Sequence, residues 1–316
     1  MSSGHGESGK RAILAALAAN FGIAIAKFVG FLITRSSSLL AEAGHSLADT
    51  TNQALLLLGR RQAQRDEDEQ HPFGYGTARF FWSFVVGLIL FTLGSLFAIF
   101  EGIEKLRKPH KLEKPIVAIA LLAVAVVLEA LSFRTAIRES RPLKGDQSWP
   151  GFIRKAKVPE LPVLLLEDAG ALAGLAIALG GISLSMATDN SRFDAYGTLL
   201  IGALLGAIAI VLVVEMRSLL LGESATPAER TQIGAALGAH PQVRRVINVR
   251  TMHIGPEDLL VAAKLEFDEA LCFAELAEAI DAAEARVRAI VPTARFMYLE
   301  PAIFDPARVG PSATAP

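Results

Sequence analysis

Residues 80–100 read FFWSFVVGLILFTLGSLFAIF, a run without a single charged side chain. A second charge-free run, YGTLLIGALLGAIAIVLVV, covers residues 196–214. The hydrocarbon core of a bilayer is crossed by about 20 helical residues. Both runs therefore predict transmembrane helices.

Four other apolar blocks, each interrupted by a few polar residues, complete a predicted set of six spans. They cover residues 12–34, 36–58, 115–133 and 161–185. With 52% hydrophobic and 20% charged residues and a mean hydropathy of +0.41, the 316-residue chain is too apolar for a soluble enzyme. The first block has no small-residue cleavage site, so we do not expect a secretory signal peptide.

The charge balance and the cysteine count exclude two classes of function. The 31 Lys and Arg are offset by 32 Asp and Glu, which leaves no overall basic field to attract nucleic acid. Cys272 is the only cysteine in the sequence, so thiolate metal clusters are excluded. Any metal must bind to oxygen and imidazole ligands, and no other cofactor is predicted.

The distribution of Lys and Arg predicts that both termini lie in the cytoplasm. That orientation puts fourteen basic residues in the inner loops and seven in the outer loops. The cluster between spans three and four, which includes Lys105 and Lys108, runs against the rule. We expect a multi-pass protein of a bacterial cytoplasmic membrane.

The composition becomes that of a soluble domain after Leu221. Thr226 and Pro227 predict the start of a helix that runs to Gly238. Strands at 243–254 and 259–267, a helix at 275–290 and a strand at 295–299 follow, in the order αββαβ of a small α+β sandwich. The predicted domains are a six-span bundle at 10–222 and a cytoplasmic domain at 223–305, with disordered ends at 1–9 and 306–316.

Ionisable residues inside the predicted membrane region fall mainly on spans two and five. His45 and Asp49 are four residues apart and share one helix face, in a polar stripe with neighbours one turn away on either side. The stripe also contains Glu42, Asn52 and Gln53. A charge in hydrocarbon costs about 2.5–3.5 kcal/mol on insertion scales, so these positions are candidates for a functional site.

On span five, Glu167 and Asp168 interrupt a run of leucines. Adjacent helical residues are about 100° apart, so only one of the two can point directly at span two. One imidazole and two or more carboxylates suit Zn²⁺, Mn²⁺ or Fe²⁺. The alternative is structural: His45 and Asp49 hydrogen-bond each other, and Asp168 caps a helix or pairs with Lys27.

The loop between spans two and three carries the acidic run DEDEQH at residues 66–71. It could attract cations to the mouth of a site, with Asp68 and His71 sharing an ion. A solvated acidic turn is the simpler interpretation of this run alone.

Three stretches resemble the cation diffusion facilitator family of metal/proton antiporters. They are GFLITRS at 30–36, LAEAGHSLAD at 40–49 and HPFGYG at 71–76. The resemblance implies homodimers of six-span protomers, a tetrahedral metal site between spans two and five, and cytoplasmic ferredoxin-like domains. It also implies that His45, Asp49 and Asp168 are metal ligands.

The sequence departs from the family pattern at several positions. Many zinc transporters of the family carry His four residues before the span-five aspartate, where this chain has Leu164. The LED sequence at 166–168 is similar to a subgroup related to mitochondrial-type zinc transporters, in which Glu167 would supply the missing oxygen. The alternative is that a water molecule fills this position of the site. Tyr75 replaces the second loop histidine, which puts a loop metal site in doubt.

The C-terminal domain departs from the family as well. Lys264 and Leu299 occupy strand positions that bind zinc in some members, so we expect weak or absent metal-triggered closure. His253, with Glu257 and Asp258 across a turn, is the remaining candidate cluster, and a turn-stabilising role is the favoured interpretation.

The leading hypothesis is secondary transport, with export of a divalent metal driven by protons. Small residues in span six, such as Gly202 and Gly206, would allow the close packing that a rocking bundle needs. One alternative is an intramembrane metallohydrolase, although the sequence has no HExxH motif. The other is a scaffold or metal regulator that has lost transport.

Overall fold

The computed structural model describes residues 17, 21–33, 35, 37–109 and 115–306. Within α2 it does not describe the side chains at 37–39, 41, 42 and 45. The predicted disordered start at 1–9 lies outside the described residues, as does nearly all of the predicted tail at 306–316. The chain divides into two compact units, residues 1–61 with 81–217 and residues 62–80 with 218–316.

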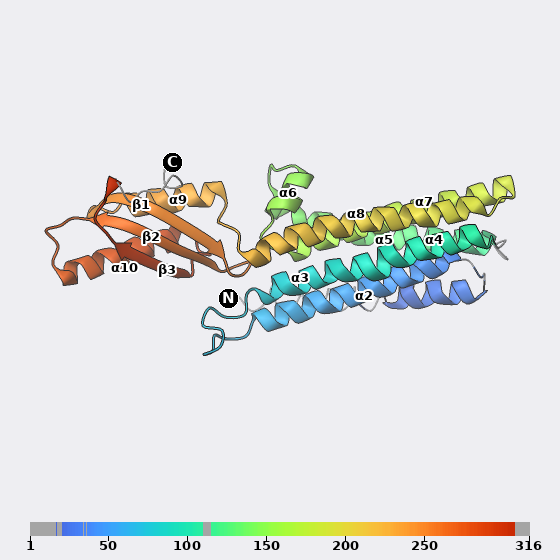
Figure 1. The fold of residues 1–316 in the computed structure, drawn as a ribbon, viewed down its shortest axis with the longest axis horizontal. Helices are drawn as coiled ribbons and strands as arrows, with labels where there is room; N and C mark the ends of the chain where they lie inside the picture. Colours follow the sequence, from blue (N-terminus) through green and yellow to red (C-terminus); the bar gives the residue numbers. More distant parts are fainter. Residues whose placement is uncertain (1–16, 18–20, 34, 36, 110–114, 307–316) are drawn as a thin grey trace. The chain divides into compact units, whose positions relative to one another are not determined.

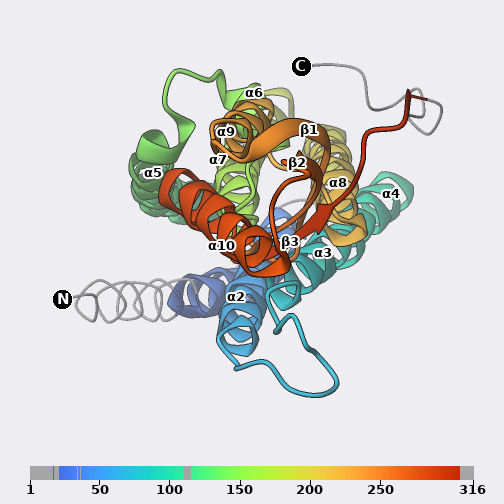
Figure 2. The ribbon, with the colours of Figure 1, turned by 90° about the vertical axis from the view of Figure 1, so that its left-hand side faces the viewer.

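The first unit is a bundle of long helices that run side by side (Figures 1 and 2). Among the described residues, four helical stretches are long and apolar enough to cross a membrane: Ala78–Arg107, Pro115–Lys144 (α5), Glu160–Thr188 (α7) and Arg192–Leu221 (α8). A shorter apolar helix covers Phe21–Ile33, and α2 spans Ser37–Ala63. A helix of 30 residues is about 45 Å long, so the longest ones exceed the roughly 30 Å hydrocarbon core.

The stretch Ala78–Arg107 contains a π-helical segment in its middle. It comprises α3 (Ala78–Ile89), the π-helix η1 (Leu90–Leu96) and α4 (Phe97–Arg107). Ser95, on η1, donates a 2.8 Å hydrogen bond to the carbonyl of Gly202 on α8. A Cβ on Gly202 would lie 2.7 Å from the Ile99 side chain, so the absence of a side chain there permits this close approach.

The second unit contains the αββαβ domain predicted from the sequence. Helix α9 covers Pro227–Gly238 and begins with a capping box of Thr226 and Glu229. Strands β1 (Val243–His253) and β2 (Leu259–Phe267) are antiparallel, and β3 (Phe296–Pro301) pairs parallel to β2, in the order β1-β2-β3. Helix α10 covers Phe273–Ile290 and shares the hydrophobic core with α9 and one face of the sheet.

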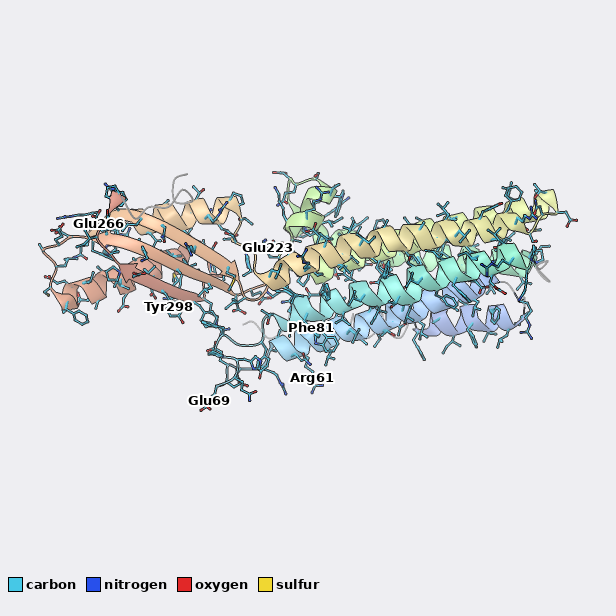
Figure 3. The ribbon with its side chains drawn as sticks, in the orientation of Figure 1. Arg61, Glu69, Phe81, Glu223, Glu266 and Tyr298 are labelled. Atoms are coloured by element: carbon cyan, nitrogen blue, oxygen red, sulfur yellow. The ribbon has the colours of Figure 1, made fainter. Side chains whose placement is uncertain are left out.

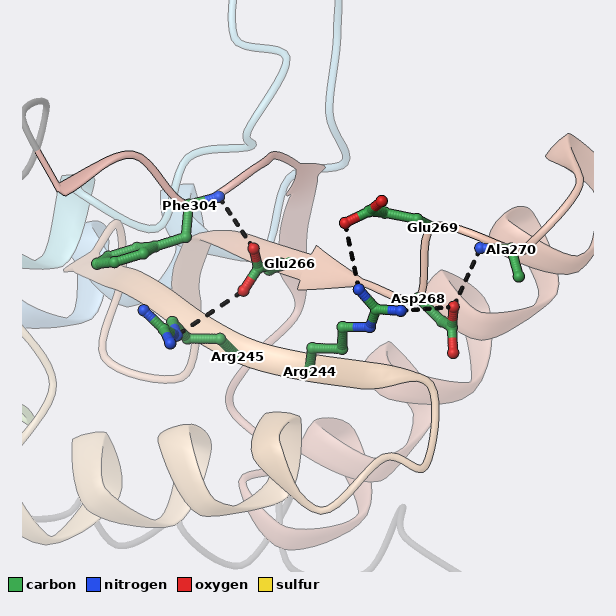
Figure 4. Close-up of polar contacts among 7 residues, drawn as sticks. All are labelled: Arg244, Arg245, Glu266, Asp268, Glu269, Ala270 and Phe304. Carbon is green, nitrogen blue, oxygen red and sulfur yellow. Dashed lines mark hydrogen bonds and ion pairs between the residues drawn. The ribbon is translucent and has the colours of Figure 1, made fainter.

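Ion pairs and a cation–π contact connect β1 with the end of β2 and with the segment after β3 (Figure 4). Arg244 contacts Asp268 at 3.1 Å and Glu269 at 3.2 Å. Glu266 accepts a hydrogen bond from the Phe304 amide, and the Arg245 guanidinium lies 3.9 Å from the centre of the Phe304 ring. The segment after β3 is thus held to the sheet by side chains of the domain itself.

The structure differs from the sequence prediction in three details. Each described long helix extends beyond its predicted apolar block at one or both ends. A short helix α6 (Trp149–Lys155), which was not predicted, lies between α5 and α7. The loop at 62–80 groups with the C-terminal residues rather than with the helices that it joins.

Candidate metal site and its surroundings

Helix α2 contributes a buried polar face to the first unit. Asp49, Asn52 and Gln53 are all buried, and Asn52 has no exposed surface. The backbone of His45 lies on α2, but its side chain, like that of Glu42, is outside the described part of the chain. The predicted stripe is therefore buried wherever its side chains are described.

Glu167 and Asp168 on α7 face different neighbouring helices. Asn52 of α2 donates a 3.0 Å hydrogen bond to Glu167 Oε1. Ser132 of α5 donates a 3.1 Å hydrogen bond to Asp168 Oδ2. The angle between adjacent helical residues explains this division, and it directs Glu167 rather than Asp168 towards α2.

Asp49 brings the two acidic residues of α7 into one cluster. Its carboxylate lies close enough to Glu167 and to Asp168 for its charge to act on both. All three side chains are buried. Like charges gathered in an apolar surrounding are unfavourable unless a cation or protons neutralise them.

Glu129 on α5 is a fourth buried carboxylate, and it lies within the predicted span at residues 115–133. It is 6% exposed and its charge acts on Asp168. Its spacing from Ser132, three residues along the same helix, places both on the face that meets α7. This three-residue spacing is the feature of the sequence by which Glu129 could have been assigned to the cluster.

Several buried oxygens of the cluster lack a donor among the described residues. Glu167 Oε2, Asn52 Oδ1 and Gln53 Oε1 have no hydrogen-bond partner there. Unsatisfied buried oxygens are costly, and they are also the ligands that a hard or borderline cation would use. The described side chains alone do not form a group of three or more His, Cys, Asp or Glu with metal-binding geometry.

The alternative to a metal site was that Asp168 caps a helix or pairs with Lys27, and the observed contacts of these residues bear on it. Lys27 donates a 2.7 Å hydrogen bond to Ser46 on α2, whereas Asp168 and Glu167 accept theirs from Ser132 and Asn52. Leu164, where many zinc transporters of the resembled family carry His, packs with an apolar cluster around Phe152. Its position is therefore part of the helix packing.

The acidic loop after α2 forms an ordered turn centred on Asp68, with Glu69 at its outer end (Figure 3). Asp68 accepts hydrogen bonds from the backbone amides of Gln70 and His71 and from the Tyr75 hydroxyl, the last at 2.5 Å. The bond from Tyr75 is the main reason that the pKa of Asp68 is lowered, and the same bond raises the pKa of Tyr75. Tyr75 thus holds the carboxylate that would otherwise be available to an ion.

The same loop packs on the C-terminal part of the second unit. Glu67 forms a 2.6 Å ion pair with Arg295, and Phe73 meets the Phe296 ring edge-on at 5.3 Å. A Cβ on Gly76 would lie 2.8 Å from the Ile254 carbonyl oxygen, so a glycine is needed at this contact. The HPFGYG stretch therefore has a packing role that its sequence alone did not indicate.

The candidate ligands of the C-terminal domain differ in burial and in their partners. His253 is buried, whereas Glu257 is 82% exposed and pairs with Arg79, and Asp258 pairs with Arg295. Lys264 forms an ion pair with Glu300 at 2.9 Å, and Leu299 is part of the hydrophobic core. These contacts support structural roles for the turn and the strands.

Sequence comparisons provide independent evidence on the family. The sequence profile of the cation efflux transmembrane domain matches residues 13–221. The chain is 33% identical over 77% of its length to the mitochondrial proton-coupled zinc antiporter SLC30A9 of Xenopus laevis, and 29% identical over 82% to metal tolerance protein C4 of Arabidopsis thaliana. It is 32% identical over 39% of its length to the zinc transporter ZitB of Pectobacterium atrosepticum. These matches cover 44%, 57% and 37% of the respective relatives, so the chain spans less than half of SLC30A9.

Proposed function

The chain belongs to the cation diffusion facilitator family, and we propose that it exports a divalent transition-metal cation in exchange for protons, with Zn²⁺ as the principal cargo. The family consists of metal transporters, so we set aside the intramembrane metallohydrolase. Two of the relatives named above carry zinc transport in their names, which supports Zn²⁺. Mn²⁺, Fe²⁺ and Co²⁺ are further candidates, since carboxylate oxygens accept harder ions.

The buried acidic cluster of Asp49, Glu167 and Asp168 is the observation that carries this proposal. The cargo would bind to oxygens of these carboxylates and to the imidazole of His45. All of these groups must lose protons before they coordinate a metal. Metal and protons therefore compete for the same site, and this competition is the chemical basis of exchange.

Transport requires that the site open to each side of the membrane in turn. With both termini in the cytoplasm, metal would enter from the cytoplasmic side and displace protons. Movement of the helices would then expose the site to the other side, where protons displace the metal. An inward proton gradient makes this cycle run towards export, and we expect the working unit to be a homodimer in a bacterial cytoplasmic membrane.

Metal uptake into proteoliposomes tests the proposal. The purified protein would be reconstituted and given a proton gradient, and accumulation of Zn²⁺, Mn²⁺, Fe²⁺ and Co²⁺ would be compared. We expect gradient-dependent accumulation with Zn²⁺ transported best. Metal binding without accumulation would instead identify a scaffold or regulator.

Two substitutions address the site within the same assay. Asp49→Ala should abolish accumulation without impairing membrane insertion, because it removes a charge from the bilayer. Asp146→Ala, in an exposed turn, is the matched control and should transport normally. An Asp49→Ala protein with full activity would contradict the mechanism.

Glu167→Gln tests whether the carboxylate facing α2 is a ligand. Glutamine can still accept the hydrogen bond from Asn52, so the change removes the charge and keeps the helix contact. We expect metal affinity, measured by calorimetry, to fall by about tenfold or more. Glu139→Gln on the exposed side of α5 should leave affinity unchanged, and equal affinities in both variants would show that Glu167 serves only helix packing.

A further inference from the structure

The end of α5 and the short helix α6 carry a concentration of positive charge that transport does not use. Residues 134–160 contain seven Lys and Arg and only three Asp and Glu. We call the basic residues of this segment the basic belt: Arg134, Arg138, Arg141, Lys144, Arg154, Lys155 and Lys157.

Five members of the basic belt are exposed cations without an internal counterion. Within the described residues, no carboxylate pairs with Arg134, Arg138, Arg141, Arg154 or Lys155. Lys105 on α4 and Lys108 directly after it differ from these residues, because each of the two pairs with an acidic residue. The charge of these five residues is therefore available to an anion outside the chain.

The position of the basic belt along α5 corresponds to the headgroup level of a bilayer. The apolar part of α5, residues 115–133, is about 28 Å long at 1.5 Å per residue, close to the thickness of the hydrocarbon core. Arg134, Arg138 and Arg141 follow directly and are spaced four and three residues apart, which places them along one helix face. They continue α5 into the interfacial layer.

Helix α6 adds apolar anchors to this positive surface. Phe152 is buried against Ala136 and Leu165, which ties α6 to α5 and α7. The Lys144 ammonium lies 5.4 Å from the centre of the Trp149 ring, and Leu143 is 58% exposed beside it. Aromatic and aliphatic side chains next to unpaired cations are typical of segments that lie in a membrane interface.

We infer that the basic belt is a binding site for the headgroups of anionic phospholipids. Guanidinium groups bind phosphate oxygens through paired hydrogen bonds, and clusters of four to eight basic residues beside a transmembrane helix attract anionic lipids. A free phosphate would satisfy the charges but would leave Leu143 and the exposed part of Trp149 in water. A lipid satisfies both, because its acyl chains cover the apolar side chains.

Binding of short-chain lipids to the full-length protein in neutral detergent tests this inference. The probes are dioctanoyl phosphatidylglycerol and dioctanoyl phosphatidylcholine at low salt, with inorganic phosphate as a competitor. The test variant is Arg138→Gln/Arg141→Gln. The control, Arg230→Gln/Arg250→Gln, removes the same charge from exposed positions of the C-terminal domain.

We expect phosphatidylglycerol to bind more tightly than phosphatidylcholine, and the test variant to lose about tenfold or more in affinity for it. The control should bind as the wild type does, and both variants should melt at the wild-type temperature. Equal affinity for the two lipids, an unchanged test variant, or displacement of the lipid by equimolar inorganic phosphate would each overturn the assignment. Each of these readouts is independent of metal transport.

Discussion

Removing the buried lysine of α4 provides a quantitative test of how this bundle is held together. Lys105 donates hydrogen bonds to Asp194 and to Thr198 of α8, the latter at 3.2 Å. The Lys105 and Asp194 side chains are 11% and 7% exposed. The change Lys105→Met keeps a long apolar side chain and leaves the Asp194 charge buried without this partner.

The expected loss of stability follows from that burial. Breaking a buried ion pair by removing one partner costs about 3–5 kcal/mol, since the remaining charge has lost both water and counterion. For a unit of 150–250 residues, each kcal/mol lowers the melting temperature by roughly 2–4 °C. We therefore expect Lys105→Met to melt about 6–20 °C below the wild type.

Thermal unfolding in detergent, followed by intrinsic fluorescence, would measure this shift. The double variant Lys105→Met/Asp194→Leu removes both charges and should recover most of the loss. The matched control is Lys108→Met at the C-cap of the same helix. Lys108 pairs with Glu104 in an exposed position, so this change should have no measurable effect on the melting temperature. A Lys105→Met protein that melts within 2 °C of the wild type, or a double variant less stable than the single one, would refute the reasoning.

Three further predictions concern the second unit. The hydrogen bond that Tyr75 donates to Asp68, together with the negative charge of Asp68, favours the protonated phenol. Absorbance titration at 295 nm should therefore show the Tyr75 pKa above its ordinary value in the wild type and back in the ordinary range in Asp68→Asn. The hydrogen bond stabilises the loop below the ordinary tyrosine pKa and is lost as pH rises through the raised one. Gly76→Ala should speed protease cleavage between residues 64 and 77, because the added Cβ would collide with the backbone packed against this loop. The control Gly234→Ala on α9 places its Cβ in open space and should not change the cleavage rate. Equal cleavage of the two variants would argue against the packing of the loop described above. The isolated residues 223–305 should give the same circular dichroism spectrum with and without a chelator, and unfolding on chelation would reveal a structural metal.

Local patterns in the sequence were sufficient for the family, for the long apolar helices and for the order of the elements in the C-terminal domain, but not for α6 or η1. Charge-free runs long enough to cross a bilayer predict membrane helices, and the family match over residues 13–221 confirms the resemblance that the LAEAGHSLAD stretch indicated. The αββαβ order of the C-terminal domain was also predictable, because capping residues and alternating strands are short-range signals. The capping box at Thr226 is an example, since all of its contacts lie within four residues.

The contacts between distant residues depended on the tertiary structure. The sequence shows that Glu167 and Asp168 cannot both face α2, but only the packing of α2, α5 and α7 directs Glu167 to Asn52 and Asp168 to Ser132. In the sequence, Lys105 is one of the basic residues that run against the predicted orientation of the helices. The structure pairs it with Asp194, 89 residues away. The reason is physical: helix periodicity determines which residues share a face, whereas the neighbour that each face meets depends on how the whole chain packs.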